Sequence, residues 1–168
     1  MNAVFLGLGS NKGDRFGYLR QAVDSLKRIP GVAVKAVSSV YETEPRGVEI
    51  QSDFLNAAAL VESDVPAEEL VGSLKMLERS LGRTASQRWG PREIDIDMLF
   101  YGGLVLDTAL LIIPHPELHK RRFVLEPLLE LAPDFMHPRL RASVSVLYSQ
   151  CPDKGWVRKT SMKLMQPE

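Results

Sequence analysis

The feature that most constrains the fold is the run at residues 94–99, where apolar side chains alternate with Asp95 and Asp97. This alternation predicts a β-strand that ends at Gly102-Gly103. Because successive strand side chains point to opposite faces, both carboxylates project from one face, with their Cα atoms roughly 6.6 Å apart. Two like charges this close on a half-buried strand repel each other, and a cation between them is the simplest compensation. The spacing suits one shared Mg²⁺ or two ions about 3.5–4 Å apart.

The size and composition of the chain indicate one globular domain. The 168 residues are 45% hydrophobic and 25% charged, which argues against disorder. Equal numbers of basic and acidic residues, 21 each, exclude a whole-molecule attraction to nucleic acid. The lone Cys151 excludes an internal disulfide, the N-terminus has the pattern of a strand, and no apolar run is long enough to span a membrane. We therefore expect a cytoplasmic, monomeric protein with a single domain over residues 1–168.

The order of apolar patterns predicts an α+β fold. The expected elements are strands at 3–8, 32–41, 54–61 and 94–101, helices at 15–29, 66–81, 124–131 and 142–150, and short apolar runs at 104–106 and 110–113. This order fits a ferredoxin-like βαββαβ core with a mainly antiparallel central sheet and flanking helices. We expect the helices on one face of the sheet and the loops on the other. Residues 104–106 should pair back as a hairpin strand, and 153–168 should form a basic, weakly ordered tail.

Three loops are candidates for a binding site. Residues 9–14 could cradle a phosphate, but they lack the known glycine-rich spacings, and a turn with Asp14 as helix N-cap is the simpler interpretation. Residues 43–52 form a long polar connection that suits a lid. Residues 83–92 contain Arg83, Arg88 and Arg92, whose planar forks match phosphate oxygens. Such a cluster is usually solvated surface, but its position just before the paired aspartates favours a nucleoside triphosphate site.

Several other side chains allow two interpretations each. Trp89 either stacks on a base or anchors its loop, and Asn56 in an apolar strand either makes a structural hydrogen bond or recognises the polar edge of a heterocycle. His115, between two prolines, and the nearby Arg121 are either surface residues or a second phosphate-binding cluster.

The segment from Arg88 to Leu99 resembles the signature of the 6-hydroxymethyl-7,8-dihydropterin pyrophosphokinase family of folate biosynthesis. Further segments resemble the same family in the same order, so the resemblance covers roughly residues 3 to 135. These segments are 7–11, 38–43, 53–58 and 114–123.

The resemblance implies Mg²⁺-dependent transfer of pyrophosphate from ATP to the pterin hydroxymethyl group, with release of AMP. It implies that Asp95 and Asp97 bind two Mg²⁺ ions and that Arg83 and Arg92 join them as catalytic residues. Glu78 matches a polar position of the family, and the loops at 10–14, 43–52 and 83–92 would close over the substrates. The implied ATP-binding residues are Arg83, Arg88, Trp89, Arg92, His115 and Arg121, and the implied pterin-binding residues are Thr43, Phe54, Asn56, Asp95 and Phe123.

Two other functions remain compatible with the residues alone. A paired-aspartate strand on a ferredoxin-like core also suits nucleotidyl transferases and phosphodiesterases that use two metal ions. Such a sheet also occurs in RNA-binding modules, but carboxylates on the exposed strand would repel a phosphate backbone.

Overall fold

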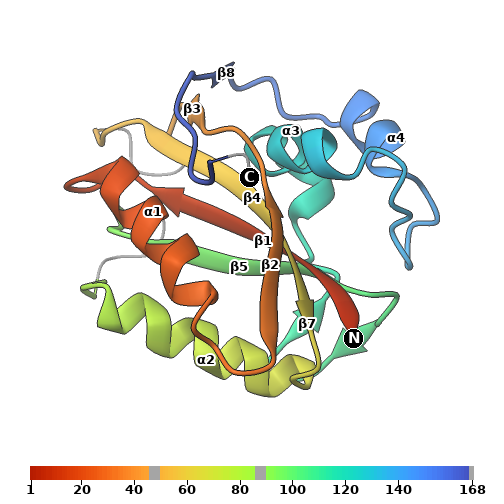
Figure 1. The fold of residues 1–168 in the computed structure, drawn as a ribbon. Coiled ribbons are helices and arrows are strands. Elements are labelled where there is room, and N and C mark those ends of the chain that lie inside the picture. Colours follow the sequence, from red (N-terminus) through yellow and green to blue (C-terminus); the bar gives the residue numbers. More distant parts are fainter. Residues whose placement is uncertain (46–49, 86–89, 167–168) are drawn as a thin grey trace.

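The computed structural model describes residues 1–45, 50–85 and 90–166, which form a six-stranded sheet with helices packed against it (Figure 1). The strands of this sheet are β1 (Asn2–Ser10), β2 (Val32–Val37), β3 (Tyr41–Thr43), β4 (Phe54–Ser63), β5 (Asp95–Tyr101) and β8 (Val157–Lys159). The helices are α1 (Arg15–Leu26), α2 (Ala67–Ser80), α3 (Arg122–Leu131) and α4 (Val144–Ser149), with a 3₁₀ turn at Leu118–Lys120. Strands β6 (Leu106–Asp107) and β7 (Ile112–Ile113) form a separate small sheet.

The topology of the sheet confirms the predicted core. The strand order is β5-β1-β4-β3-β8, and β2 also pairs with β4. Every one of these pairings is antiparallel. The elements β1, α1, β2, β4, α2 and β5 therefore form a ferredoxin-like βαββαβ unit in which β1 lies between β4 and β5.

Helices cover both faces of the sheet, so the expectation that they cover one face is wrong. Alternate residues of β1 show this: Val4, Leu6 and Leu8 pack into the core beneath α1 and α2, whereas Phe5 packs into a second core with residues of α3 and α4. In Figure 1, α1 lies at the left with α2 below it, and α3 and α4 lie at the upper right. The physical reason is that 122–131 and 144–149 have apolar faces of their own, and these cover Phe5 and its neighbours on β5.

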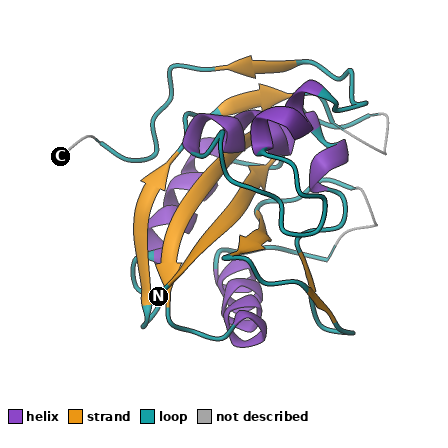
Figure 2. Cartoon of the chain, turned by 90° about the vertical axis from the view of Figure 1, so that its right-hand side faces the viewer, coloured by secondary structure: helices purple, strands orange, loops and turns teal. Residues whose placement is uncertain are grey.

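Three local predictions are settled by the strand pairings. The phase change near Ala36 is confirmed by a register shift between Val34 and Ala36, and the predicted strand divides into β2 and β3. The hairpin prediction is wrong, because Leu106 pairs with Ile113 and not with β5. The predicted weakly ordered tail is also wrong for the described residues, because β8, the strand along the top of Figure 2, pairs with β3. Leu164, further along the same segment, is buried in the core.

The start of helix α1 agrees with the prediction from the sequence. The Asp14 side chain accepts a 3.0 Å hydrogen bond from the Gly17 backbone N–H and caps α1, as predicted. Within the described ranges, no helix is both long enough and apolar enough to cross a membrane.

Candidate active site

A cavity of about 390 Å³ opens on the face of the sheet that carries α3. Its floor is Gly7 and Gly9 of β1. In the strand register, Gly9 lies between Asn56 of β4 and Asp95 of β5, and Gly7 is opposite Asp97. Side chains directly opposite each other share a face, so three polar groups surround a strip of backbone that has no side chains. A Cβ added at Gly9 would lie 2.8 Å from Asn56 Oδ1, so glycine is needed for this close approach.

The two aspartates line this cavity together, as the alternation along β5 predicts. Arg83 Nη1 donates to Asp95 Oδ1 at 3.2 Å, and Arg92 Nη1 donates to Asp95 Oδ2 at 2.8 Å. Arg83 also pairs with Glu78, so the guanidinium lies between two carboxylates. Two predicted catalytic arginines are thus brought to one predicted metal ligand.

Glu78 reaches this cluster from the last turn of α2 and is buried. It also accepts a 3.3 Å hydrogen bond from the Ile96 backbone N–H. Because β5 is the edge strand of the sheet, this N–H has no neighbouring strand to bind, and Glu78 takes that place. Glu78 therefore anchors β5 to α2 and orients Arg83.

The carboxylates make the site electrostatically costly when no cation is bound. Burial raises the pKa of Asp97, and the charges of Asp95 and Glu78 raise it further. Burial likewise raises the pKa of Glu78, against the lowering effect of Arg83. This is the same repulsion between carboxylates from which the sequence analysis predicted a bound cation.

The pterin-side residues of the prediction, Thr43, Phe54, Asn56 and Phe123, all line the same cavity. Asn56 Nδ2 donates to Thr43 Oγ1 at 2.7 Å, and both side chains are buried. The structural and the recognition roles of Asn56 are therefore compatible, because one hydrogen bond holds the amide in place at the cavity wall. Among the described residues, the hydrogen-bond partner of its amide nitrogen is a side chain on β3, whereas the structural interpretation expected the neighbouring backbone.

His115 and Arg121 take different positions. Arg121 lines the cavity, and its guanidinium carbon lies 5.9 Å from the centroid of the Phe123 ring. His115 is not among the residues that line the cavity. Its backbone N–H donates to the Leu99 carbonyl at 3.0 Å, and its ring Nδ1 accepts from the Glu117 backbone N–H at 3.1 Å. Burial, together with the charge of Arg121, lowers the pKa of His115 to about 4. The imidazole is therefore neutral near pH 7 and carries its proton on Nε2.

The remaining predicted residues, Arg88 and Trp89, lie outside the described residues, as does part of the expected lid, residues 46–49. The described residues on the far sides of these two gaps, in 50–52 and 90–92, both contact Asn11. Its Nδ2 donates to Gln51 Oε1 at 2.8 Å and to the Ser52 carbonyl at 3.1 Å, and its Oδ1 accepts from the Arg92 N–H at 2.8 Å. The predicted lid and the arginine loop are therefore tied to the end of β1.

Residues 5–133 match the family model of 7,8-dihydro-6-hydroxymethylpterin-pyrophosphokinase, which is most of the chain. The chain belongs to this family. A 2-amino-4-hydroxy-6-hydroxymethyldihydropteridine pyrophosphokinase from Aquifex aeolicus is 43% identical over 141 residues, which are 84% of this chain and 87% of the relative. The enzyme of the same name from Bacillus subtilis is 45% identical over 130 residues, 77% of this chain and 78% of the relative. The resemblance found in the sequence is confirmed.

Solved structures agree on the fold of this pyrophosphokinase. A crystal structure of Plasmodium falciparum HPPK-DHPS superposes with a TM-score of 0.69 at 16% identity. The match covers 89% of this chain and 43% of that chain. At this identity the likeness supports the mixed α/β architecture with its mainly antiparallel sheet.

Glu44, in the predicted lid segment, also lines the cavity. The sequence did not single out four further lining residues as site residues: Lys120, Asp153 and, within the family segment 7–11, Gly7 and Gly9. The two glycines had a usable signal, because glycine inside an apolar strand marks a close backbone approach. Lys120 lies in a basic run whose individual members have no distinguishing pattern. Asp153 lies in the segment expected to be a tail, and nothing local marks it.

Proposed function

We propose that this pyrophosphokinase transfers the β,γ-pyrophosphoryl group of ATP to the hydroxymethyl oxygen of 6-hydroxymethyl-7,8-dihydropterin and releases AMP. The observation that carries the proposal is the division of one cavity into a charged side on β5 and a second side on β3, β4 and α3 that carries two aromatic rings and an amide. We call the second side neutral after the uncharged groups Thr43, Phe54, Asn56 and Phe123, although Glu44 and Asp153 also line the cavity there. A triphosphate needs the first kind of surface, and a flat heterocycle needs the second.

The neutral side would hold the pterin. Phe54 and Phe123 would pack against the two faces of the ring, which is favourable for flat aromatic systems. Asn56 would recognise the polar edge of the ring with its remaining donor and acceptor groups, since Thr43 takes one amide hydrogen. Site residues held in place before binding lose little freedom when the ligand arrives.

The charged side would hold the triphosphate. Arg83, Arg92 and Arg121 would bind its oxygens, with Arg88 and Trp89 as further ATP-binding residues, and His115 would donate a neutral hydrogen bond from Nε2. Arg83 and Arg92 are engaged with Asp95 in this structure. We expect these two guanidinium groups to turn from the carboxylate to the phosphates when Mg-ATP binds.

Asp95 and Asp97 would hold the two Mg²⁺ ions of the reaction. Among the described residues, no three side chains of the ligating types cluster as a complete metal cage. This agrees with Mg²⁺, which commonly uses one or two carboxylates together with substrate phosphates. The repulsion between the buried Asp97 and its neighbours also fits a cation. Bound Mg²⁺ neutralises phosphate charge and lowers the pKa of a coordinated hydroxyl.

The chemistry is an in-line displacement at the β-phosphorus. The pterin hydroxyl oxygen gives up its proton to solvent water and forms the new bond to this phosphorus. The bond to the oxygen that bridges the α- and β-phosphates breaks, so that AMP leaves with that oxygen and its electron pair. Asp95, which borders both sides of the cavity, would place the hydroxymethyl group in line with the triphosphate. Arg83 and Arg92 would stabilise the charge that develops on the phosphate oxygens. The loops joined through Asn11 would limit the entry of water, which competes as an acceptor.

The test is an assay of AMP formation from protein, Mg-ATP and 6-hydroxymethyl-7,8-dihydropterin. We expect AMP and a diphosphorylated pterin in equal amounts, and none when the pterin is omitted or Mg²⁺ is chelated. Release of pyrophosphate instead of AMP would indicate a nucleotidyl transferase. No AMP above the blank without pterin, from folded protein with Mg²⁺ present, would contradict the proposal.

The single domain and the monomeric state also stay predictions. Sedimentation velocity would test the monomeric state.

A further inference from the structure

The C-terminal segment Asp153–Thr160 lies beyond residue 133, where the family match ends, yet Asp153 lines the cavity. We call residues 153–160 the strap. In Figure 2 the strand β8, which is part of the strap, runs along the top of the molecule toward the C-terminus. The hydrogen bonds of the strap reach two separate walls on the neutral side of the cavity.

One end of the strap holds the first turn of α3. Asp153 Oδ2 accepts a 2.9 Å hydrogen bond from the Arg122 N–H, and Asp153 Oδ1 accepts a 2.8 Å bond from the Gly155 N–H. The side chain of Arg121, at the N-cap position of α3, makes no capping hydrogen bond. Asp153 therefore provides from a distance the cap that the local sequence of α3 lacks. The turn it caps carries Phe123, and Arg121 directly precedes that turn.

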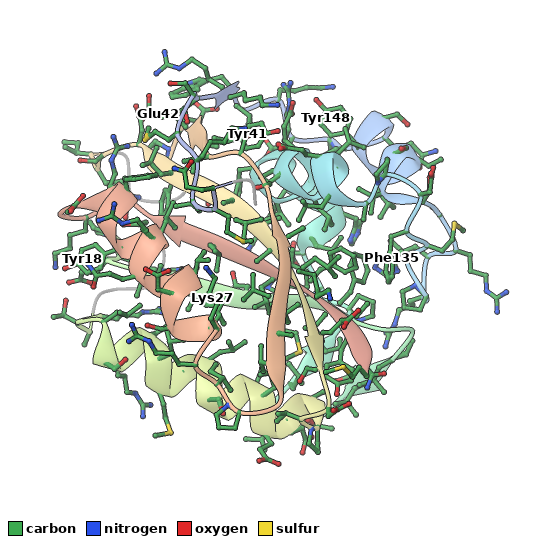
Figure 3. The ribbon with its side chains drawn as sticks, in the orientation of Figure 1. Tyr18, Lys27, Tyr41, Glu42, Phe135 and Tyr148 are labelled. Atoms are coloured by element: carbon green, nitrogen blue, oxygen red, sulfur yellow. The ribbon has the colours of Figure 1, made fainter. Side chains whose placement is uncertain are left out.

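The other end of the strap holds β3 and the residue after it. The Trp156 N–H donates to Glu44 Oε1 at 3.2 Å, and Val157 pairs with Thr43 in the β3–β8 register. Arg158 forms an ion pair with Glu42, which Figure 3 shows near the top of the molecule beside Tyr41. Because Thr43 of β3 accepts a hydrogen bond from the Asn56 amide, the strap supports that amide indirectly, through β3, which lies between β8 and β4.

We infer that the strap is a positioning element of the pterin site and that Asp153 is its main positioning residue. It joins the wall that carries Phe123 to the wall that carries Thr43 and Glu44, and so sets the width of the space between them. This inference rests on the proposed function, since it takes the neutral side of the cavity as the pterin site. On β5, Asp95 is held by Arg83 and Arg92 and not by the strap, whose printed hydrogen bonds go to the first turn of α3 and to the residue after β3.

If the strap positions the pterin site, changing Asp153 should affect the pterin selectively. Asp153→Asn keeps the shape of the side chain but replaces one acceptor oxygen by a donor that faces an N–H group. We expect the KM for the pterin to rise about tenfold, the size of a lost helix cap, while the KM for ATP changes less than about twofold. Asp153→Ala should raise the pterin KM further. The pterin Kd, measured by fluorescence titration without turnover, should follow the same order.

The matched control is Asp107→Asn, which removes an exposed carboxylate on β6, outside the cavity lining. It should leave both KM values and kcat unchanged. A purely structural role of Asp153 would lower the melting temperature and reduce the active fraction, which changes kcat and leaves both KM values alone. That result, an unchanged enzyme, or equal rises in both KM values would overturn the inference.

A second variant tests the opposite end of the strap. Glu44→Gln weakens the bond from Trp156 and should also raise the pterin KM selectively, so it carries the test if Asp153→Asn does not fold. The wild-type enzyme is assayed for AMP in the same series. If the wild type makes no AMP, the proposed function fails and this inference fails with it. If the wild type is active and neither variant changes pterin binding, only the role of the strap is wrong.

Discussion

The two sides of the cavity differ in how far their side chains are already arranged for a ligand. On the neutral side, Asn56 is fixed by Thr43, and the first turn of α3 is capped by Asp153. On the charged side, Arg83 and Arg92 are bound to Asp95 and so are not yet free for phosphate. We therefore expect the first arrangement to accept a flat ring as it stands, and the second to exchange partners when a ligand binds.

The difference follows from charge. A hydrogen bond between neutral groups, such as that of Asn56 and Thr43, satisfies both without a ligand. Clustered carboxylates instead repel one another unless a proton or a positive charge offsets them, and Arg83 and Arg92 supply positive charge here. The comparison teaches that the neutral side should set affinity for the pterin, while the charged side should set the rate and depend on Mg²⁺.

The largest effect should come from the charged side. Asp97→Ala removes one of the two proposed metal ligands, and we expect the rate of AMP formation to fall at least about 10³-fold, or about 4 kcal/mol, because this charge stabilisation acts in the transition state. Steady-state AMP assays at saturating pterin and ATP would measure it. Asp134→Ala, at an exposed site outside the cavity lining, is the control. A near-normal rate for Asp97→Ala would remove the metal role from β5.

A smaller effect of a different kind should come from the neutral side. Phe54→Ala removes one ring from the pterin wall, and we expect the pterin KM to rise about 30-fold, or about 2 kcal/mol, with little change in the KM for ATP. Phe16, a half-buried aromatic residue of α1 outside the cavity, is the matched control. Phe16→Ala should lower stability and leave the pterin KM unchanged. If Phe54→Ala reduced kcat alone, the division between the two sides would be wrong.

The pH dependence of stability tests the state of His115. Its pKa is lowered from about 6.5 to about 4 by burial first and by Arg121 second, so the unfolded chain binds a proton more readily than the fold does. Its contribution is therefore complete above about pH 6.5 and is lost as the pH falls toward 4. With allowance for partial exposure, we expect a loss of about 2 kcal/mol.

Urea denaturation of the wild type and of His115→Gln, at several pH values in this window, would measure this contribution. The wild type should lose stability relative to the variant as the pH falls. A constant difference between the two proteins would show that the imidazole is not held neutral, and the charged side would then contain one more cation than we describe.

The smallest effect concerns the floor that separates the two sides. Gly9→Ala places a Cβ 2.8 Å from Asn56 Oδ1 and should displace that amide, which we expect to weaken pterin binding about tenfold, or about 1.4 kcal/mol. Gly72→Ala, in α2 with no atom within 4 Å of the added Cβ, is the matched control and should stabilise the protein by about 0.5–1 kcal/mol. Fluorescence titration with the pterin measures the first effect, and thermal unfolding the second. Equal pterin affinities in the two variants would mean that Asn56 does not contact the ring.

The sequence by itself determined the local features of this protein. The alternation around Asp95 and Asp97 determines that both carboxylates share a face, and Asp14 determines where α1 begins. The order of the elements implied the ferredoxin-like core, and the motif from Arg88 to Leu99 indicated the family. Each of these depends on residues close together in the chain, or on a pattern specific enough to stand alone, so no knowledge of distant contacts was needed.

Only the tertiary structure decided which distant groups meet. The register of β1 places Gly9 between Asn56 and Asp95, and the hydrogen bonds of Asn11 bring residues 51–52 to Arg92. The pairing of β8 with β3 turns an expected tail into a strap that caps α3 through Asp153. These contacts join residues tens of positions apart, and many alternative pairings satisfy the same local patterns. The choice among them depends on burying both faces of the sheet at once, which is a property of the whole chain.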